Sequence, residues 1–385
     1  MMFKLKKSLL ATAVSVAVMA PAMHANAGGT ITFGEDKYVS VGFGLRGGFT
    51  STEDGAANGD SRSKDFTLDS ARIFLSGSIN KYIKGMLNTE KSIAGEGFQA
   101  IDANVQIYIT PDVAIWAGRF LSPSDRANLA GPYYSLGGGY WSGIASRYGF
   151  NAGYIGRDDG VAVVGNALDG KLGYSFGAFE GNREFQIAPN AALVAPVRGS
   201  DALMYAGRLQ YDFWDAEPGY YGTGNYLGTK DILAIGIAGR VQNNGAVSAT
   251  EQGKYSSYSV DFLLEKKDLG PGGLSIEAAY YEYDTDGVFK SEQGKAYSAG
   301  AGYIFNDAVG WGKFQPYVRY QKFNADGRLA GGVITDDSTT TKRYDLGLAY
   351  IIDGYNAQIS GFYSDTKVTG SNSINAINVA MQFQF

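Results

Sequence analysis

The sequence predicts an all-β protein: a transmembrane antiparallel β-barrel of about 16 strands with an in-folded constriction loop. Three observations predict this fold. The chain begins with the three parts of an export signal. The whole chain is rich in glycine and aromatic residues, with 54 Gly, 27 Tyr and 21 Phe against 9 Pro among 385 residues. Its strand-like segments alternate apolar with polar residues, as strands do when one face meets lipid and the other meets water.

The first 27 residues form the expected signal peptide. Lys4, Lys6 and Lys7 give a positive start, Leu9 to Ala20 is a short apolar run, and Ala25-Asn26-Ala27 is a cleavage motif. An N-terminal membrane anchor is the alternative interpretation, but the run is too short to span a bilayer. We therefore expect 1–27 to be removed, and 28–385 to form one barrel domain in the bacterial outer membrane.

The composition excludes most catalytic chemistry. The single histidine is His24, inside the signal peptide, and the chain has no cysteine. Ser-His and Cys-His nucleophiles, His- or Cys-ligated zinc sites and disulfides are therefore impossible after residue 27. We expect no enzyme activity and no cofactor or metal.

The alternation is clear in 203–213, where Tyr205, Leu209 and Tyr211 oppose Arg208 and Gln210. Segments 232–242, 257–265, 342–351 and 373–385 repeat the pattern. No run after the signal has the 18 or more apolar residues of a transmembrane helix. Tyr and Phe gather toward the ends of the apolar faces, which is typical of the aromatic girdles of a membrane barrel.

Sixteen strands fit the length of the chain, because each spanning strand takes about 9–11 residues and its connections take further residues. Counts of 14 or 18 stay open. The expected strands are 38–50, 65–79, 80–91, 98–109, 112–121, 159–167, 171–182, 201–214, 228–243, 254–267, 273–285, 295–306, 312–324, 342–352, 355–366 and 373–385. Short connections at 110–112, 169–170 and 353–354 are expected to be periplasmic turns. Longer ones at 51–64, 122–157, 183–200, 244–253, 286–294 and 325–341 are expected to be extracellular.

A barrel of this size cannot fill its interior with strand side chains, so a water channel is expected. The sequence therefore indicates passive diffusion of small hydrophilic solutes. The long connection 122–157 carries Arg126, Arg147 and Arg157 with a single acid, Asp125. We expect it to fold into the lumen and set the constriction, because long loops are usually functional. The alternative is a surface loop that covers the mouth or a partner subunit.

Three segments resemble the phosphate- and polyphosphate-selective porin family (porin O/P). They are A-G-R-F-L-S-P-S-D-R at 117–126, R-D-D-G-V-A-V-V-G-N-A at 157–167 and Y-S-F-G-A-F-E-G-N at 174–182. The resemblance implies a homotrimer of sixteen-stranded barrels that prefers anions such as phosphate. It also implies arginines on the lumen wall and lysines near the constriction. The dense lysine cluster of that family is not evident in this chain.

The candidate pore-lining residues follow from the polar phase of the strands and from the long loop. They are Arg72, Lys84, Asp102, Arg119, Arg126, Arg147, Arg157, Arg208, Arg240, Glu265, Glu277 and Arg319, with Asp261 and Asp345 as further wall acids. Such a wall allows three interpretations: bidentate binding of oxyanions by arginine, a transverse field across a general pore, or pairing of each arginine with an acid to brace the barrel.

Other functions stay open at this point. A substrate-specific channel for sugars or organic acids, or a non-selective or cation-preferring pore, is the main alternative, and Tyr133, Tyr134, Tyr140, Trp141 and Tyr148 are the candidate aromatic slide. An outer-membrane enzyme or adhesin has less support. The terminal Phe385 resembles the assembly signal of outer-membrane barrels. Expected partners are therefore the barrel-assembly machinery, membrane lipid and lipopolysaccharide, and no nucleic acid.

Overall fold

The computed structural model describes residues 28–91, 97–139, 141, 143–147, 156–181, 202–217, 219–247, 251–330 and 333–385. The predicted signal peptide and the connection 183–200 lie outside the described residues, as do parts of 122–157.

One large sheet of seventeen strands dominates the described chain, with a separate two-stranded hairpin. The strands are β1 (Gly28–Gly34), β2 (Lys37–Thr52), β3 (Asp65–Asn80), β4 (Ile83–Lys91), β5 (Phe98–Thr110), β6 (Val113–Leu121), β7 (Arg157–Ala167), β8 (Leu172–Phe179), β9 (Met204–Asp212), β10 (Ile232–Val247), β11 (Gln252–Leu269), β12 (Gly272–Asp284), β13 (Gly294–Phe305), β14 (Lys313–Ala325), β15 (Arg328–Ala330), β16 (Val333–Thr335), β17 (Thr339–Asp353), β18 (Ala357–Val368) and β19 (Ile374–Gln384). One short helix, α1 (Arg126–Ala130), follows β6.

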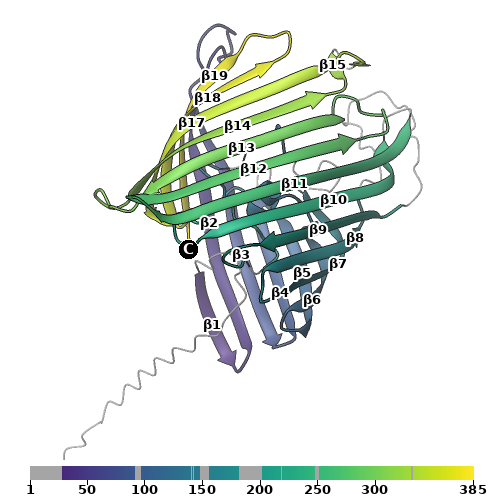
Figure 1. Cartoon of the computed structure of the whole chain (residues 1–385), viewed down its shortest axis with the longest axis vertical. Coiled ribbons are helices and arrows are strands. Elements are labelled where there is room, and N and C mark those ends of the chain that lie inside the picture. Colours follow the sequence, from purple (N-terminus) through teal and green to yellow (C-terminus); the bar gives the residue numbers. More distant parts are fainter. Residues whose placement is uncertain are drawn as a thin grey trace, which may run out of the picture.

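The sheet closes into a barrel (Figure 1). Neighbouring strands in sequence pair antiparallel from β2 to β14, then through β17, β18 and β19. The last strand, β19, pairs with β2 from Ala376↔Thr52 to Gln384↔Gly44. This ring contains sixteen strands, because β1 is an addition to the ring. The predicted strand number and antiparallel order are therefore confirmed, and each of the sixteen ring strands pairs with a neighbour on both sides, as a barrel in lipid requires.

Strand β1 was not predicted. It pairs with the first half of β2, from Gly28↔Gly42 to Gly34↔Lys37, on the edge that β19 occupies farther along. The backbone N–H of Phe385 donates to the carbonyl of Phe43 at 3.0 Å, and Phe43 donates back at 2.8 Å. The end of β19 therefore leads directly to the start of β1 along one edge of β2.

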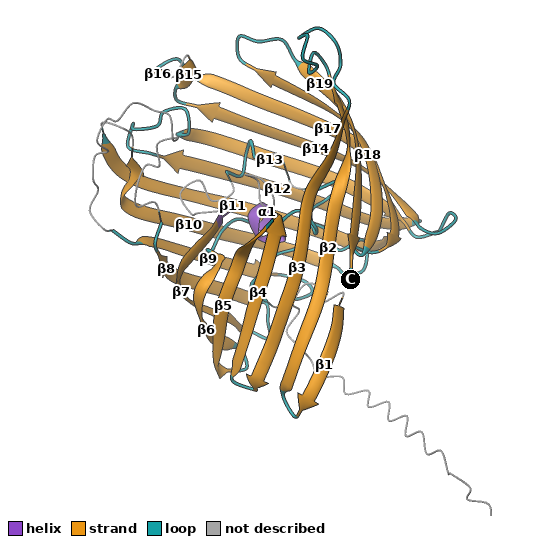
Figure 2. Cartoon of the chain, turned by 180° about the vertical axis from the view of Figure 1, so that it is seen from behind, coloured by secondary structure: helices purple, strands orange, loops and turns teal. Residues whose placement is uncertain are grey.

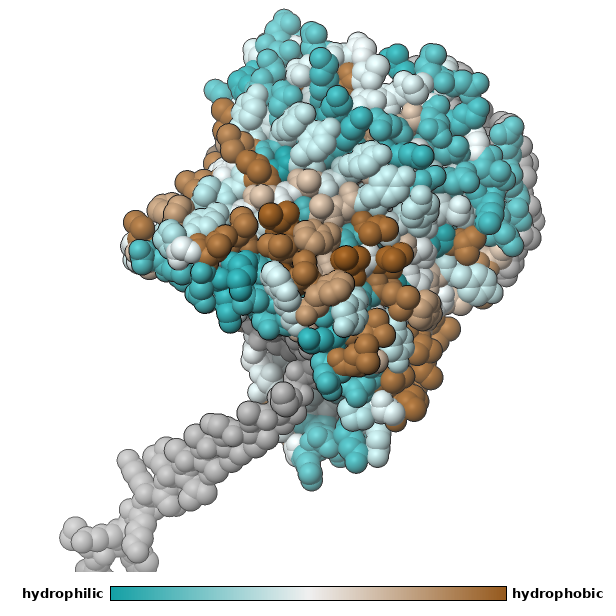
Figure 3. Space-filling model, viewed as in Figure 1, coloured by the Kyte–Doolittle hydropathy of each residue, from teal (hydrophilic) through white to brown (hydrophobic). Residues whose placement is uncertain are grey.

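The two faces of the wall sort by alternate residues, as predicted. In β9, Tyr205, Leu209 and Tyr211 are exposed on the outside, whereas Arg208 and Asp212 are buried inside. Figure 3 shows a hydrophobic band across the outer face with hydrophilic residues above and below it. Contact with lipid stabilises a band of apolar side chains that face outward.

Outward aromatic residues form rows toward both ends of the strands. One row contains the ring pairs Tyr258–Tyr280 at 6.0 Å, Tyr280–Tyr297 at 5.2 Å and Tyr320–Tyr344 at 4.8 Å. The other contains Tyr303–Phe305 at 5.2 Å, Phe314–Tyr350 at 5.0 Å and Phe383–Phe385 at 5.8 Å. These rows occupy the positions of the predicted aromatic girdles. Among the described residues, no helix is long and apolar enough to cross a membrane.

The interior is not polar everywhere. On the inner face of β6 and β8, Trp116, Phe120 and Phe179 are buried in one apolar cluster, and Tyr220 and Tyr221 from the connection 213–231 pack against it. Burying each large apolar side chain contributes about 1.5–3 kcal/mol. This part of the lumen is therefore filled by side chains, whereas the sequence predicted a polar inner face throughout.

Candidate functional site: the lumen and its two in-folded connections

The described part of the connection 122–156 lies inside the barrel. All five residues of its helix α1 are buried, and Figure 2 shows the helix among the strands. Asp125 begins the helix, accepting a hydrogen bond from the N–H of Asn128 at 3.2 Å. Tyr281, on β12, donates to the same carboxylate at 3.2 Å. The predicted in-folding of this connection is therefore confirmed for the residues that the structure describes.

Side chains of the wall hold this connection by its backbone carbonyls. Arg208 donates to Ser124 O at 3.1 Å, and Arg240 donates to Pro123 O at 3.2 Å. On the other side of the ring, Arg319 donates to Leu136 O and Gly139 O at 3.2 Å each, Arg46 donates to Pro132 O, and Gln382 donates to Tyr133 O at 3.0 Å. The loop is thus attached to β9, β10, β14, β2 and β19, on both sides of the lumen.

Most wall arginines also form buried ion pairs. Arg72 binds Glu90 at 2.7 Å, Arg157 binds Asp102 at 3.4 Å, Arg208 binds Asp261 at 2.5 Å and Arg319 binds Asp345 at 2.9 Å. These pairs agree with the third interpretation, in which each arginine pairs with an acid and so braces the barrel. A paired guanidinium has less capacity for a passing anion, because its carboxylate partner already occupies its donors.

Three charged wall residues differ from that pattern. Arg240 makes its hydrogen bonds with loop carbonyls. Glu265 accepts from the N–H groups of Tyr226 at 2.7 Å and Gly228 at 2.6 Å, and Glu277 accepts from the Trp141 indole at 3.3 Å. Within the described ranges, none of the three forms an ion pair with an oppositely charged side chain. They lie on the neighbouring strands β10, β11 and β12.

Arg119 was predicted to face the lumen, and that placement is wrong. Its register partner on β5 is Ala103, on the outer face, and its guanidinium binds Asp159 through two bonds of 2.7 Å. Both side chains are about half exposed, at 46% and 50%. The physical reason is the apolar inner face of β6. Trp116 and Phe120 point inward, so Arg119, which lies on the alternate positions of the strand, points outward.

Lys84 and Arg147 lie at opposite ends of the interior. The Lys84 ammonium lies 4.3 Å from the ring centre of Tyr108, on the inner face of β4 near the turn to β3. Arg147 forms an ion pair with Glu292 in the connection after β12, and its N–H donates to the Tyr283 hydroxyl at 3.1 Å. Arg147 therefore anchors the long connection near the other mouth.

A second in-folded connection, 213–231, was not predicted. It joins β9 to β10 at the end of the barrel opposite to that of 122–156, because connections alternate between ends in an antiparallel ring. Its Glu217 accepts two bonds from Arg126 of α1, at 2.8 and 2.9 Å, and a third from the Tyr226 hydroxyl at 2.6 Å. Arg126 also donates to Thr223 O at 2.7 Å. The two connections therefore meet inside the barrel.

The electrostatics of this junction favour the ionised pair. Burial alone would raise the pKa of Glu217, but the Arg126 charge and the bonds from Arg126 and Tyr226 outweigh it and hold that pKa below its usual value. Burial would lower the pKa of Arg126, and Glu217 raises it instead. The length of 213–231, beside the short turns at the same end, was the sequence signal that could have indicated this segment.

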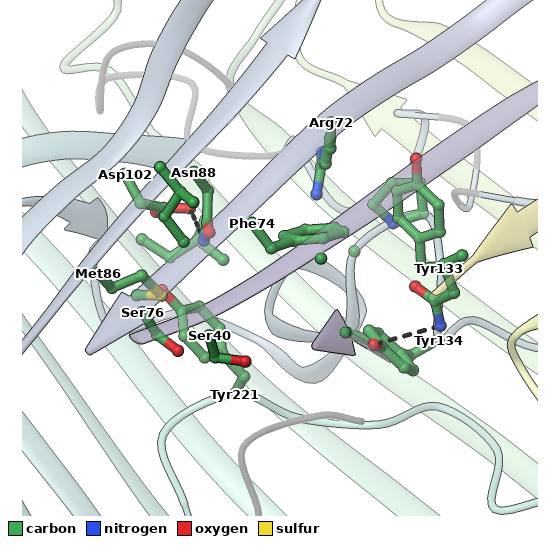
Figure 4. A pocket seen from close by; sticks show the side chains of 18 of the residues that line it. Ser40, Arg72, Phe74, Ser76, Met86, Asn88, Asp102, Tyr133, Tyr134 and Tyr221 are labelled. Carbon is green, nitrogen blue, oxygen red and sulfur yellow. Dashed lines mark hydrogen bonds between the residues drawn. The ribbon is translucent and has the colours of Figure 1, made fainter. Parts of the chain in front are cut away.

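Several cavities lie beside the described parts of these connections, and two of them share lining residues from both connections. One, of about 120 Å³, lies between the wall strands β2–β5 and residues 129–134 of the loop. Figure 4 shows its lining residues, with Asn88 and Asp102 on one side, Tyr133 and Tyr134 on the other and Phe74 between them. The second, of about 590 Å³, opens at the turn end and is lined by Tyr226, Lys230 and Tyr355 among others. Within the described ranges, no group of three or more Asp or Glu side chains is placed to hold a metal ion.

Several solved structures share this architecture. Pseudomonas putida OprB is 11% identical, with a TM-score of 0.62 over 90% of this chain and 94% of that one. An anion-selective porin from Comamonas acidovorans is 14% identical, with a TM-score of 0.57 over 90% and 99%. Salmonella typhi OmpF, solved with daunomycin, is 13% identical, with a TM-score of 0.56 over 93% and 100%.

No protein-family model and no curated relative matches the chain. The resemblance to phosphate-selective porins therefore stays a prediction from the sequence motifs. At these identities the comparisons establish the fold alone: this chain has the closed sixteen-stranded barrel fold of bacterial outer-membrane porins.

Proposed function

We propose that this chain is an outer-membrane porin that lets small hydrophilic solutes diffuse passively, with a preference for anions. The observation that carries the proposal is the connection bound across the interior of a closed barrel. Its carbonyls accept from Arg208 and Arg240 on one side and from Arg319 on the other. A fixed constriction inside a wall with an apolar exterior is the arrangement that filters solutes by size and charge.

The orientation and partners follow from the same architecture. The end that carries 122–156 faces outside and the end that carries 213–231 faces the periplasm, because barrels of this kind place their longer loops outside. The exposed aromatic rows contact lipid at the two interfaces, and the outer rim contacts lipopolysaccharide. Phe385 is the signal for the barrel-assembly machinery, and a homotrimer is the expected assembly.

The anion preference rests on Arg240. Its guanidinium is held by Pro123 O and Ser122 O, at 3.2 and 3.5 Å, rather than by a carboxylate. A carbonyl positions the arginine without neutralising it, so its positive charge acts on ions in the lumen. Glu277, on β12, opposes this field, whereas Glu265 lies opposite Ile232, eight residues along β10 from Arg240, and acts less on ions near Arg240. We therefore propose a moderate preference rather than strict phosphate selectivity.

A second candidate is a channel for uncharged sugars. The 120 Å³ cavity presents the rings of Phe74, Tyr133 and Tyr134 together with the amides of Asn88 and Gln384. Aromatic faces beside hydrogen-bonding amides suit polyhydroxylated solutes.

Two measurements on the purified protein separate these candidates. Reversal potential under a KCl gradient gives the anion-to-cation permeability, and liposome swelling gives the rates for neutral sugars. A reversal potential of anion-preferring sign supports the first candidate. A reversal potential of cation-preferring sign contradicts the anion preference. If liposomes swell faster with one sugar than its size alone predicts, the sugar channel is supported.

A further inference from the structure

Two of the cavities inside the barrel, of about 120 Å³ and about 590 Å³, adjoin each other at a partition of shared lining residues. Among all their lining residues, only Tyr134 and Tyr221 belong to both cavities. Tyr134 comes from the connection 122–156 and Tyr221 from 213–231, so each connection supplies one side chain. A solute that crosses between the cavity beside β2–β5 and the cavity at the turn end passes these two rings.

Both tyrosines are held in place by contacts on several sides. The Tyr134 ring packs edge-on against Tyr355 at 4.9 Å, and its carbonyl accepts from the N–H of Gly224 at 3.0 Å. The Tyr221 ring packs against Tyr220 at 5.3 Å and Trp116 at 6.1 Å. The partition is therefore built from rigid rings rather than from long flexible side chains.

The segment that carries Tyr221 is fixed by the buried junction described above. Glu217, four residues earlier, binds Arg126, and Arg126 binds Thr223 O two residues later. Asn225 continues the attachment, because its amide donates to Gln315 on β14 at 3.0 Å and its side-chain oxygen accepts from Ser275 on β12. The connection is thus clamped on both sides of Tyr221.

We propose that Tyr134 and Tyr221 form the size-determining partition of this pore, and that the Arg126–Glu217 pair positions Tyr221. This inference rests on the proposed channel function and adds to it the residues that set the exclusion limit. The partition is uncharged, so it selects small hydrophilic solutes by cross-section, while the arginine wall acts on charge.

The test uses the full-length mature protein in planar bilayers and in liposomes with sugars of increasing size. Tyr221→Ala and Tyr134→Ala should each raise single-channel conductance by about twofold and admit larger sugars, because pore diameter sets both. Glu217→Gln should act in the same direction with the two rings retained. Tyr221→Phe keeps the ring and should behave as wild type.

Matched controls come from the outer face. Tyr344→Ala removes an exposed ring of the same kind, and Arg119→Gln breaks an ion pair with the same bidentate geometry; both should leave conductance unchanged. Unchanged conductance and size limit in the alanine variants of a conducting protein would overturn the partition and leave the channel function standing. If neither the wild type nor any variant conducts ions, the channel function is overturned instead. If an alanine variant fails to assemble, unchanged conductance and size limit in Glu217→Gln overturns the proposal.

Discussion

Arg126 and Glu217 meet inside the barrel although they belong to connections that enter from opposite ends. Their guanidinium and carboxylate form two parallel hydrogen bonds of 2.8 and 2.9 Å, and both side chains are almost fully buried, at 1% and 5% exposure. This contact joins the described parts of the two connections inside the barrel. The described chain therefore has two in-folded connections, where the sequence predicted one.

Breaking this pair should destabilise the fold. Glu217→Gln removes the main partner of the buried Arg126 charge and leaves it only the Asp261 carboxylate at 3.7 Å, so the expected loss is about 3 kcal/mol, the lower end of the range for a broken buried pair. Arg119→Gln breaks the exposed pair with Asp159, for which the expected loss is about 0–1 kcal/mol. Urea unfolding in detergent micelles measures both. Equal losses for the two variants would show that burial does not strengthen the Arg126–Glu217 contact.

Charge reversal at Arg240 should change ion preference. Arg240→Glu removes the guanidinium whose charge is held only by carbonyls and adds a negative charge in the lumen, so the anion-to-cation permeability should fall. Arg119→Glu is the matched change on the outer face and should leave the reversal potential where it is. An effect of Arg119→Glu as large as that of Arg240→Glu would contradict the assignment of inner and outer faces.

Removal of Phe385 should slow assembly. The residue forms two backbone hydrogen bonds with Phe43 at the seam where β19 meets β2, and its ring lies 6.0 Å from that of Phe43. Truncation after Gln384 should lower the yield of the heat-modifiable, folded form in cells. Phe98→Ala, at another exposed phenylalanine away from the seam, is the control. A normal yield of folded protein after truncation would argue against Phe385 as an assembly signal and against its contribution to the seam between β19 and β2.

Alternate residues of one strand should differ in access to water. Ser76 lines the cavity on the inner face of β3, whereas Ile73 lies on its outer face. In lipid vesicles, a water-soluble thiol reagent should label Ser76→Cys and spare Ile73→Cys. The chain contains no cysteine, so each variant carries one thiol. Equal labelling of both would mean that this strand does not separate lipid from water.

The sequence predicted the barrel well because its signal is local. Alternation with a period of two appears within each strand, and lipid on one side makes it strong in β9 and β19. The missed strand β1 is short, and its Gly28 and Gly29 carry no alternating side chains. The sixteen ring strands differ from their predicted bounds by a few residues at most.

The candidate site was predicted less completely, for two physical reasons. On β6 the rule that polar residues face inward fails, since Trp116 and Phe120 pack against Tyr220 inside the lumen, and Arg119 was misplaced as a result. Contacts across the lumen, such as Arg126 with Glu217, join residues that no local spacing relates. Arg46 lies on the polar phase of β2 and was overlooked, although the alternation of that strand identifies it.

The most direct test of this account is the conductance of the purified, folded protein in a planar bilayer. Discrete current steps of uniform size are expected as single barrels insert, since water and ions must pass the partition formed by the two connections. A protein that inserts in its heat-modifiable form and yet carries no current above that of the lipid would contradict it.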